Sequence, residues 1–381
     1  MKANVEEEAK MNKVDLLEVY LNACRVGRIA LTPEGLCAFE YDSAWLNREY
    51  ALSPFYLPLK SGLMIAKRDP FRGNFGVFDD SLPDGWGNLL FDRFLQEKGI
   101  NPYKLTILER LSLIGSTGRG ALEYRPDRSI VTVEELLDFD KLALESQKLL
   151  STSIATDSLD TLYRYGGSSG GARPKVFATI DSKEWLVKFK ASTDPEDVGE
   201  TEYKYALLAK ACGIKMPETK LFNGKYFGVE RFDRTANGKV HTVSAAGLLH
   251  ADYRIPSLDY ALLLKLTLQL TKDIEQVADM FRLMVFNVVI SNRDDHAKNF
   301  SFQYGGGSWR LSPAYDLLPS NGFNGYHTTT FNGKGEPTRA DIFALATEVG
   351  LQKQRAENIF DEITTKCNER KMAKFNMRKY N

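Results

Sequence analysis

Residues 274–316 constrain the fold of this chain more than any other segment, because a helix, a polar loop and a hairpin are predicted to follow one another there. Apolar side chains recur with helical spacing at the start of the segment, which predicts a helix with one buried face. The polar loop SNRDDHAKNF then occupies residues 291–300. Two strand-like runs, 300–303 and 309–312, flank the turn Tyr-Gly-Gly-Gly at 304–307 and predict a β-hairpin.

The predicted hairpin determines where three polar residues lie, because a hairpin folds its two ends together. Asp294 and Asn299 precede the hairpin and Asp316 follows it, so we expect all three to converge. One carboxylate could accept a proton while the other two residues bind Mg²⁺, a cation that takes few protein ligands and adds phosphate oxygens. These roles suit phosphoryl transfer, in which catalysis is mostly positioning and charge neutralisation. The alternative is that these residues only cap a helix and form turns, and His296, taken singly, is more often structural than catalytic.

A second candidate element is the glycine-rich segment GGSSGG at residues 166–171, which precedes a β segment and Lys175. It lacks the Gly-Lys-Ser/Thr ending of a Walker motif. Small residues let backbone N–H groups approach phosphate oxygens, although a flexible linker has the same composition. Lys188 follows in an alternating strand, where it either points to solvent or reaches phosphates. A buried lysine needs a counter-charge, for which we expect Glu202, with Glu200 as the second choice.

The composition excludes several function classes. The chain has 381 residues, of which 43% are hydrophobic and 26% charged, enough for two or three domains with their own cores. Its 50 basic and 50 acidic residues balance, so no overall field recruits nucleic acid or a membrane, and the locally basic stretch ERKMAKFNMRKY is interpreted as a solvated helix end. The sequence shows no membrane span and no export signal. Its 4 cysteines lack metal-ligand spacing, which favours reduced thiols in a cytoplasmic protein.

Local patterns divide the chain into successive regions. Strands are predicted at 14–21, 25–31 and 35–41, and helices at 85–98, from Asn101-Pro102 to about Gly115, and after a capping box at 132–135. A linker at 151–158 precedes a β-rich unit with one helix at 196–212, and helical patterns dominate from residue 257 onward. The expected domains are a polar tail at 1–12, an N-terminal subdomain at 13–150, a β-rich nucleotide-binding lobe at 151–240 and a mainly α-helical catalytic lobe at 241–381.

The glycine loop, the strand lysine, the Asp-x4-Asn loop and the aspartate after a hairpin stand in the order that protein-kinase-like enzymes use. The chain departs from ordinary protein kinases, since Tyr315-Asp316-Leu317 replaces Asp-Phe-Gly and no Ala-Pro-Glu segment is present. It closely resembles the HipA family of serine/threonine kinase toxins from bacterial toxin–antitoxin systems. The segments that carry the resemblance are SSGGARPK, WLVKF, VERFDR, NRDDHAKNFSF and LSPAYDLLP, with LPDGWGNLL and LIGSTGRGALEYRP in the N-terminal region.

The resemblance implies an α+β fold with the two lobes of a protein kinase and a fused N-terminal α/β subdomain. It implies ATP and Mg²⁺ as cofactors. The residues that match family positions are Asp294 as catalytic base, Asn299 and Asp316 as metal ligands, Lys188 as the phosphate-contacting lysine, His296 and Tyr315 as nucleotide contacts, Gly170, Gly171, Ala172, Arg173, Pro174 and Lys175 as the nucleotide loop, and Glu230 and Phe232 as the segment that holds the adenine.

Family members autophosphorylate a serine of the glycine loop, which corresponds to Ser168, with Ser169 as the alternative. The added charge would lie where the ATP phosphates bind, and would eject the loop and switch the enzyme off. The family's partner is a small HipB-like DNA-binding antitoxin, through which DNA would be contacted only indirectly. The best known relatives phosphorylate an aminoacyl-tRNA synthetase, but substrates differ across the family and the sequence assigns none to this chain.

Three other functions could use some of the same residues. A small-molecule kinase shares the catalytic core. A regulatory scaffold that binds nucleotide without catalysis would not need every catalytic residue that is present. A metal-dependent phosphodiesterase usually gathers more histidines and carboxylates than surround His296. We therefore expect a cytoplasmic serine/threonine protein kinase that acts as a growth-inhibiting toxin.

Overall fold

A computed structural model describes residues 13–48, 50–130, 136–151, 158–322 and 324–374. The chain forms two compact units, of which the first comprises Met1–Gly199 and Lys220–His241 and the second Glu200–Thr219 and Thr242–Asn381. Both units contain helices and strands, so the α+β prediction is confirmed. The division into the four expected domains stays a prediction.

The first unit begins with a five-stranded antiparallel sheet in the order β4-β3-β2-β1-β5. Alternate side chains of β1 and β2, such as Leu17, Val19 and Ile29, are fully buried on one face, as the period of two predicts. The tight turn between these strands places Asn22 and Ala23 at φ 47° and 65°. The strands are β1 (Leu16–Leu21), β2 (Cys24–Leu31), β3 (Cys37–Tyr41), β4 (Met64–Ile65) and β5 (Leu122–Arg125).

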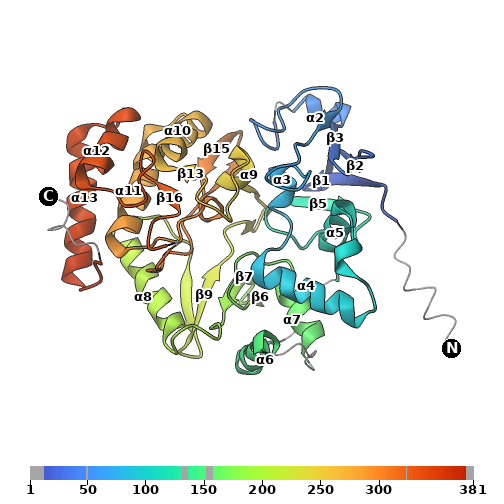
Figure 1. Ribbon diagram of the computed structural model, residues 1–381, viewed down its shortest axis with the longest axis horizontal. Helices are drawn as coiled ribbons and strands as arrows, with labels where there is room; N and C mark the ends of the chain where they lie inside the picture. Colours follow the sequence, from blue (N-terminus) through green and yellow to red (C-terminus); the bar gives the residue numbers. More distant parts are fainter. Residues whose placement is uncertain (1–12, 49, 131–135, 152–157, 323, 375–381) are drawn as a thin grey trace. The chain divides into compact units, whose positions relative to one another are not determined.

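Helices cover the middle of the first unit. Helices α4 and α7 lie side by side (Figure 1). The rings of Phe94 and Tyr163 stack between them, with their centroids 4.1 Å apart. The predicted helix at 85–98 is confirmed by α4, whereas the capping box at 132–135 and most of the linker at 151–158 lie outside the described residues. The helices are α2 (Ser43–Leu46), α3 (Gly76–Asp79), α4 (Gly85–Glu97), α5 (Ile107–Ile114), α6 (Phe139–Ser151) and α7 (Leu159–Gly166).

The helix expected from residue 101 to about 115 begins later than predicted. Asn101 caps only the 3₁₀ turn η1 (Pro102–Lys104), and Leu105 is extended at φ −72° and ψ 131°. The α-helix α5 starts after Thr106, whose side chain and that of Glu109 form a capping box. The prediction was wrong at this end because the Thr-x-x-Glu box is a stronger start signal than Asn-Pro.

A second sheet of the first unit has the order β6-β7-β9-β8. Trp185, Val187 and Val176 belong to one hydrophobic core together with buried side chains of α4, α6 and α7. The β6–β7 pair is antiparallel and places Lys175 opposite Lys188. The strands are β6 (Lys175–Ile180), β7 (Lys183–Lys188), β8 (Thr219–Phe222) and β9 (Tyr226–Glu230), followed by the small ribbon of β10 (Arg234–Thr235) and β11 (Gly238–Lys239).

The second unit is mainly helical. Its central helix is α11, in which every side chain from Met280 to Ile290 except Arg282 is buried, the pattern of a helix packed on nearly all sides. Helices α10, α12 and α13 lie around it (Figure 1). The helices are α8 (Val198–Ala211), α9 (Ala245–Leu249), α10 (Tyr260–Thr271), α11 (Ile274–Ile290), η2 (Ala297–Asn299), α12 (Arg339–Glu348) and α13 (Lys353–Glu369).

The second unit also contains short strands, which form one small sheet and one two-stranded pair. A three-stranded sheet has the order β12-β14-β15, and β13 pairs with β16 in parallel. The hairpin β14–β15 confirms the one predicted around the triple glycine, with Gly305 opposite Ser308. The strands are β12 (His241–Ser244), β13 (Leu258–Asp259), β14 (Ser301–Gly305), β15 (Ser308–Leu311) and β16 (Thr329–Thr330).

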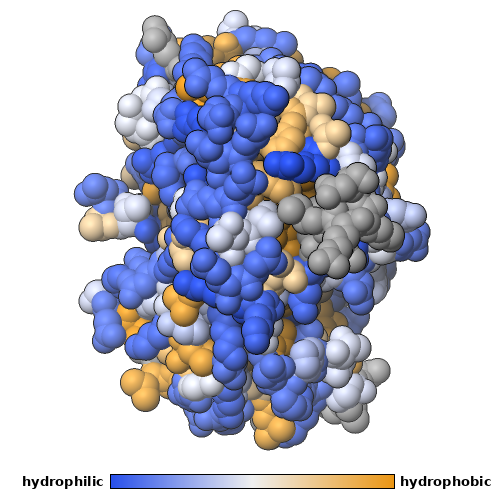
Figure 2. All heavy atoms as spheres, turned by 90° about the vertical axis from the view of Figure 1, so that its left-hand side faces the viewer, coloured by the Kyte–Doolittle hydropathy of each residue, from blue (hydrophilic) through white to orange (hydrophobic). Residues whose placement is uncertain are grey.

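The surface agrees with the balanced composition. Figure 2 shows a largely hydrophilic face on which hydrophobic side chains are scattered. Among the residues that the structure describes, no helix combines the length and the apolar character needed to cross a membrane. Cys24, Cys37, Cys212 and Cys367 all carry free thiols.

Candidate functional site

The polar loop after α11 presents Asp294 at the surface of the second unit. The helix ends at Ser291, which adopts a left-handed conformation at φ 56° and turns the chain. Asp294 is exposed, and its backbone N–H donates to Ser320 Oγ at 2.8 Å. Asn299 Nδ2 donates to the Asp294 carbonyl oxygen at 2.7 Å. Two of the three residues expected to converge therefore lie in direct contact.

The hairpin brings the third residue back to the same loop. Tyr315, the neighbour of Asp316, donates its hydroxyl to the carbonyl oxygen of Lys298 at 2.6 Å. Asn292 Nδ2 donates to the Asp316 carbonyl oxygen at 3.1 Å. The segments around Asp294, Asn299 and Asp316 are thus joined by hydrogen bonds, as the hairpin argument predicted.

Asn299 and Asp316 have the donor chemistry that Mg²⁺ prefers. The nitrogen of the Asn299 amide is used by the bond to Asp294, which leaves the oxygen, Oδ1, to face a cation. The described part of the chain contains no cluster of three or more His, Cys, Asp or Glu residues able to hold a metal. A site of one amide and one carboxylate does not need such a cluster, because Mg²⁺ keeps waters and phosphate oxygens in its shell. The two residues therefore fit a magnesium ion that arrives with a nucleotide.

His296 and Tyr315 are both tied into this loop. His296 Nδ1 accepts the backbone N–H of Lys298 at 3.3 Å and begins the 3₁₀ turn η2. Its ring is half-buried and lies 6.0 Å from the ring of Tyr253. The Tyr315 hydroxyl contacts both Lys298 and Ser301. Tyr315 could therefore offer its ring, and His296 its second nitrogen, to a nucleotide.

In the first unit, the glycine loop leads directly to Lys188. Lys175 and Lys188 are opposite one another in the β6–β7 pair, and both are buried. The backbone N–H of Phe189 also donates to the Pro174 carbonyl oxygen at 2.8 Å. Lys188 Nζ lies 5.7 Å from the centre of the Phe227 ring, a distance at which a cation and an aromatic face attract. The loop and the lysine expected to bind phosphates are thus neighbours.

The two glutamates expected as counter-charges for Lys188 differ in burial and in pairing. Glu202 is buried at 4% exposure, as a partner for a buried lysine should be. Glu200, the second choice, is half-exposed and pairs instead with Lys204 at 2.7 Å on the same helix. The Lys188–Glu202 pair stays a prediction.

Each residue of the glycine loop has a distinct environment. Gly171 and Ala172 are exposed, and Gly171 adopts a φ of 86° that favours glycine. Arg173 forms two parallel hydrogen bonds with Asp194, at 2.9 and 3.1 Å. Lys175 Nζ donates to the Gly170 carbonyl oxygen across the loop. Both cationic side chains at this end of the loop, Arg173 and Lys175, are therefore already paired within the protein.

The glycine loop rests on the PDGWG segment at the start of α4, a contact that the sequence did not predict. The Gly171 backbone N–H donates to the carboxylate of Asp84, and the Trp86 backbone N–H donates to the Gly171 carbonyl oxygen at 2.9 Å. A Cβ added to Gly87 would lie 2.2 Å from the Ser169 carbonyl oxygen. The glycines of PDGWG are therefore required because two backbones approach closely. The repeated glycine in that segment was the available signal.

The two candidate serines differ in accessibility. Ser168 is partly exposed, and its hydroxyl donates to the Thr117 carbonyl oxygen at 3.0 Å. Ser169 is 1% exposed, and its hydroxyl donates to the Gly166 carbonyl oxygen at 2.6 Å. Of the two, Ser168 is the better placed to receive a phosphate.

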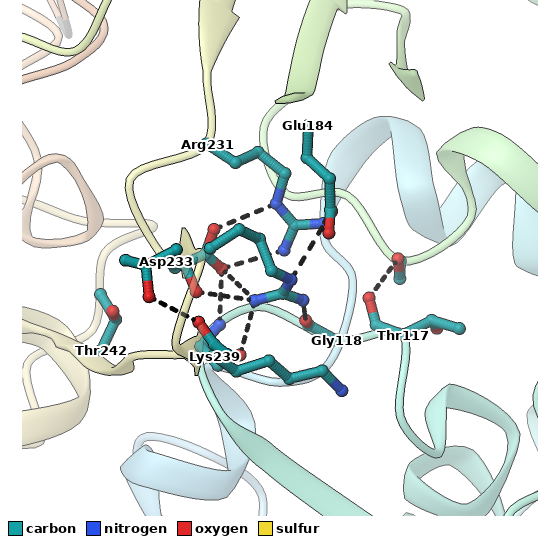
Figure 3. A network of polar contacts seen from close by, with 12 residues as sticks. Thr117, Gly118, Glu184, Arg231, Asp233, Lys239 and Thr242 are labelled. Atoms are coloured by element: carbon teal, nitrogen blue, oxygen red, sulfur yellow. Dashed lines mark hydrogen bonds and ion pairs between the residues drawn. The ribbon is translucent and has the colours of Figure 1, made fainter. Parts of the chain in front are cut away.

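The VERFDR segment is fixed by a buried charge network, shown in Figure 3. Asp233 binds Arg231 and Arg234 at 2.9 and 3.0 Å and accepts the Gly120 N–H at 2.8 Å. Burial alone would raise the pKa of the Asp233 carboxyl, but the two guanidinium groups hold that pKa far below its usual range. The network therefore joins VERFDR to the segment around Gly120.

The two residues expected at the adenine stand at the edge of this network. Glu230 pairs with Lys183 at 2.9 Å in a half-exposed position, and Phe232 is partly exposed. Neither is buried in the core, so both remain accessible to a ligand. Their side-chain contacts to adenine stay a prediction.

Known proteins are similar to this chain over most of its length. The HipA-like C-terminal domain matches residues 167–371 and the HipA N-terminal domain matches residues 17–125. Two Sinorhizobium fredii proteins are similar: "Putative kinase Y4dM" is 25% identical over 81% of this chain and 78% of its own length, and "Putative kinase Y4mE" is 28% identical over 80% and 77%.

A solved structure shares the fold. The HipA chain of the Shewanella oneidensis HipA, HipB and operator DNA complex superposes with a TM-score of 0.69 and 18% identity, over 93% of this chain and 89% of that one. The family match spans both the glycine loop and the Asp294 loop. The chain belongs to the HipA family.

Proposed function

We propose that the chain is an ATP- and Mg²⁺-dependent serine/threonine protein kinase that acts as a toxin. The observation that carries this proposal is the joining of Asn299 and the Asp316 segment to the loop of an exposed aspartate, Asp294. An exposed carboxylate beside two oxygen donors can accept a hydroxyl proton while a bound cation neutralises phosphate charge. The kinase names of the two similar proteins support the same reaction.

Each unit contributes a separate function. In the first unit, Lys188, Lys175 and the loop Gly170–Lys175 would bind the phosphates, and Glu230 and Phe232 would hold the adenine. In the second unit, Asp294 would accept the proton of a serine or threonine hydroxyl, and Asn299 and Asp316 would hold Mg²⁺. Mg²⁺ would supply charge neutralisation on the phosphates.

Ser168 is the proposed site of self-inactivation. Its phosphate would add roughly −1.5 to −2 charges to the loop that is expected to receive the phosphates of ATP. The exposure of Ser168 and the burial of Ser169 support this choice. Transfer between two molecules is expected, so the rate per molecule should rise with protein concentration.

The partner proposed for this chain is a HipB-like DNA-binding antitoxin. Support comes from the similar Shewanella protein, whose structure contains HipA, HipB and operator DNA. The kinase would act in the cytoplasm. The protein it phosphorylates is to be identified by experiment.

A labelled-ATP assay tests the proposal. Purified chain and Mg²⁺ should transfer phosphate to the chain and to proteins of a cell lysate, and mass spectrometry should find the label at Ser168. The Ser168→Ala variant should retain transfer to other proteins and lose its own label, whereas Ser169→Ala should keep it. Transfer only to small molecules would favour a small-molecule kinase, and ATP binding without transfer would favour a regulatory scaffold.

A further inference from the structure

Asp295 follows the proposed base directly, yet its side chain is fully buried while that of Asp294 is exposed. A buried carboxylate is costly unless hydrogen-bond donors surround it. Asp295 has such donors from two separate segments. They are the Tyr260 hydroxyl at 2.7 Å, His327 Nδ1 at 2.8 Å, the Thr328 N–H at 2.9 Å and the Thr329 N–H at 3.2 Å.

The hydrogen bonds continue from Tyr260 toward the metal-ligand segment. Asn287 Nδ2 donates to the Tyr260 hydroxyl at 3.1 Å. Asn292 Nδ2 donates both to Asn287 Oδ1 and to the Asp316 carbonyl oxygen, each at 3.1 Å. A continuous chain of buried polar groups therefore runs from Asp295 to Asp316.

The hydrogen-bonded chain restrains the backbone at both of its ends, at Asp295 and at Asp316. At one end, Asp295 is buried and the adjacent Asp294 is exposed, so the bonds to Asp295 hold the backbone from which Asp294 projects. At the other end, Asp316 adopts a φ of 54°, a left-handed conformation that is unfavourable for a residue with a Cβ. The bond from Asn292 to the Asp316 carbonyl restrains that conformation.

The buried surroundings make these bonds hard to replace. Tyr260 is 0% exposed, Asn287 2% and Asn292 3%, so water cannot substitute for a missing partner. Burial and the nearby Asp295 carboxylate raise the pKa of the Tyr260 hydroxyl well above its usual value, which keeps it a hydrogen-bond donor at every physiological pH. The direction of each bond in the chain is therefore fixed.

We propose that Asp295, Tyr260, Asn287 and Asn292 form a positioning relay, which holds the exposed Asp294 and the ligand segment at Asp316 in one fixed relation. None of the four touches the reacting atoms; each acts through the residues it holds. The inference rests on the proposed phosphoryl transfer, because it assigns these residues to that reaction. Misplacement of reacting groups by about 1 Å can cost about 100-fold in rate, so the relay should be visible in kinetics.

The relay is cut most gently by Tyr260→Phe, which removes one hydroxyl and keeps the ring. We expect kcat for phosphate transfer to fall about tenfold or more in protein that is still fully folded at the assay temperature, although the melting temperature falls because buried partners of the hydroxyl are left unsatisfied. Tyr205→Phe is the matched control, since Tyr205 is also buried in the second unit and its hydroxyl donates to the Met372 carbonyl oxygen at 3.4 Å, outside the hydrogen-bonded chain from Asp295 to Asp316. The control should keep the wild-type kcat.

Asn292→Asp tests the other end, because it replaces a donor by an acceptor that faces two oxygens. The Mg²⁺ concentration for half-maximal binding of a non-hydrolysable ATP analogue, measured by calorimetry, should rise about tenfold. Loss of folded protein alone would reduce the amplitude of binding and leave that concentration unchanged. The kcat effects of Tyr260→Phe and Asn292→Asp should also be non-additive, because each cuts the same chain.

The outcomes separate the relay from the proposed function. Wild-type kcat and Mg²⁺ dependence in both variants would overturn the relay while leaving the kinase proposal intact, and so would additive losses that follow the melting temperature. A wild-type chain that binds the analogue with Mg²⁺ but transfers no phosphate would overturn the kinase proposal. In that case the Mg²⁺ shift of Asn292→Asp would still support or refute the relay as a device that positions Asp316.

Discussion

The glycine loop of the first unit and the Asp294 loop of the second are held in different ways. The glycine loop is held from outside, by Asp84, Trp86 and Thr117, through bonds to its backbone or to a partly exposed hydroxyl. The Asp294 loop is held from beneath, by the fully buried Asp295 carboxylate. Release of the exposed end of the glycine loop, at Gly171 and Ala172, would admit water to Asp84, which is 8% exposed where Asp295 is 0% exposed. Release of the Asp294 loop would leave a buried charge unpaired, which is far more costly.

The difference indicates which half of the proposed reaction can be regulated. A loop whose contacts water can replace is suited to opening, to modification and to exchange of nucleotide. A loop anchored by a buried charge is suited to hold a base and a metal ligand without reorganisation. Four experiments would break or sharpen this distinction.

The largest effect is expected in the fixed loop. Asp294→Asn keeps the size of the side chain and removes the proton acceptor, so kcat should fall by about 10²–10⁴-fold. ATP binding should persist in calorimetry. Asp279→Asn is the control, since Asp279 is partly exposed and pairs with the exposed Lys215 at 2.7 Å, outside the Asp294 loop. A normal rate in Asp294→Asn would show that another group is the base.

The first unit also contains a rigidly held element, the buried charge network around Asp233. Asp233→Asn would leave the buried Arg231 and Arg234 with the 40% exposed Glu184 as their remaining carboxylate partner, and should cost about 3–5 kcal/mol of unfolding free energy. Urea unfolding followed by tryptophan fluorescence measures the loss. The half-exposed Asp140, paired with Lys225, is the control, and Asp140→Asn should cost at most about 1 kcal/mol. Equal losses in the two variants would contradict the role of the buried network.

A smaller effect should loosen the glycine loop alone. Gly87→Ala places a Cβ 2.2 Å from the Ser169 carbonyl oxygen, although alanine favours a helix over glycine by about 1 kcal/mol. We expect amide hydrogen exchange in residues 167–171 to accelerate several-fold while α4 stays protected. Gln96→Ala in the exposed part of the same helix should leave that exchange unchanged. Slower or equal exchange in Gly87→Ala would mean that the loop does not rest on PDGWG.

The last experiment concerns the loss of stability at acid pH that is due to His241. Burial lowers the pKa of His241 to about 4, and its Nε2 lies 2.9 Å from the Leu52 carbonyl oxygen. Below a pH of about 6.5 the His241 imidazole is protonated in the unfolded chain but stays neutral in the folded chain. The free energy of unfolding therefore falls by about 1.4 kcal/mol per pH unit as the pH drops toward 4. Above pH 6.5 this group contributes no pH dependence. His241→Gln should flatten the difference in unfolding free energy between pH 7 and pH 5, and an unchanged slope would contradict the shift.

Local sequence patterns predicted the second unit well. The buried helix α11, the hairpin β14–β15 and the meeting of Asp294 with Asn299 all depend on residues close in sequence. Periodicity and turn chemistry determine such features. The start of α5 was the exception, because the sequence offers two caps five residues apart and the capping box of Thr106, the stronger local signal, begins the α-helix.

Long-range contacts escaped prediction. Asp84 and Gly171 are 87 positions apart, and no pattern in either segment names the other. The doubled aspartate of NRDDHAKNF was visible, but the sequence cannot tell which of Asp294 and Asp295 faces inward. That choice depends on Tyr260 and His327, which lie on separate segments and supply the buried donors.

The chain passes between the two units at 199/200, at 219/220 and at 241/242, and this affects the order in which the protein can be completed during synthesis. The sheet of β1 to β5 has all its strands once residue 125 has left the ribosome. Strand β7, in contrast, must wait for β9, its partner from Trp185 to Val187, which is made only after the whole of α8. Until then β7 exposes an unpaired edge, the kind of surface that invites aggregation. A nascent chain stalled near residue 199 would therefore hold one finished sheet and one open one.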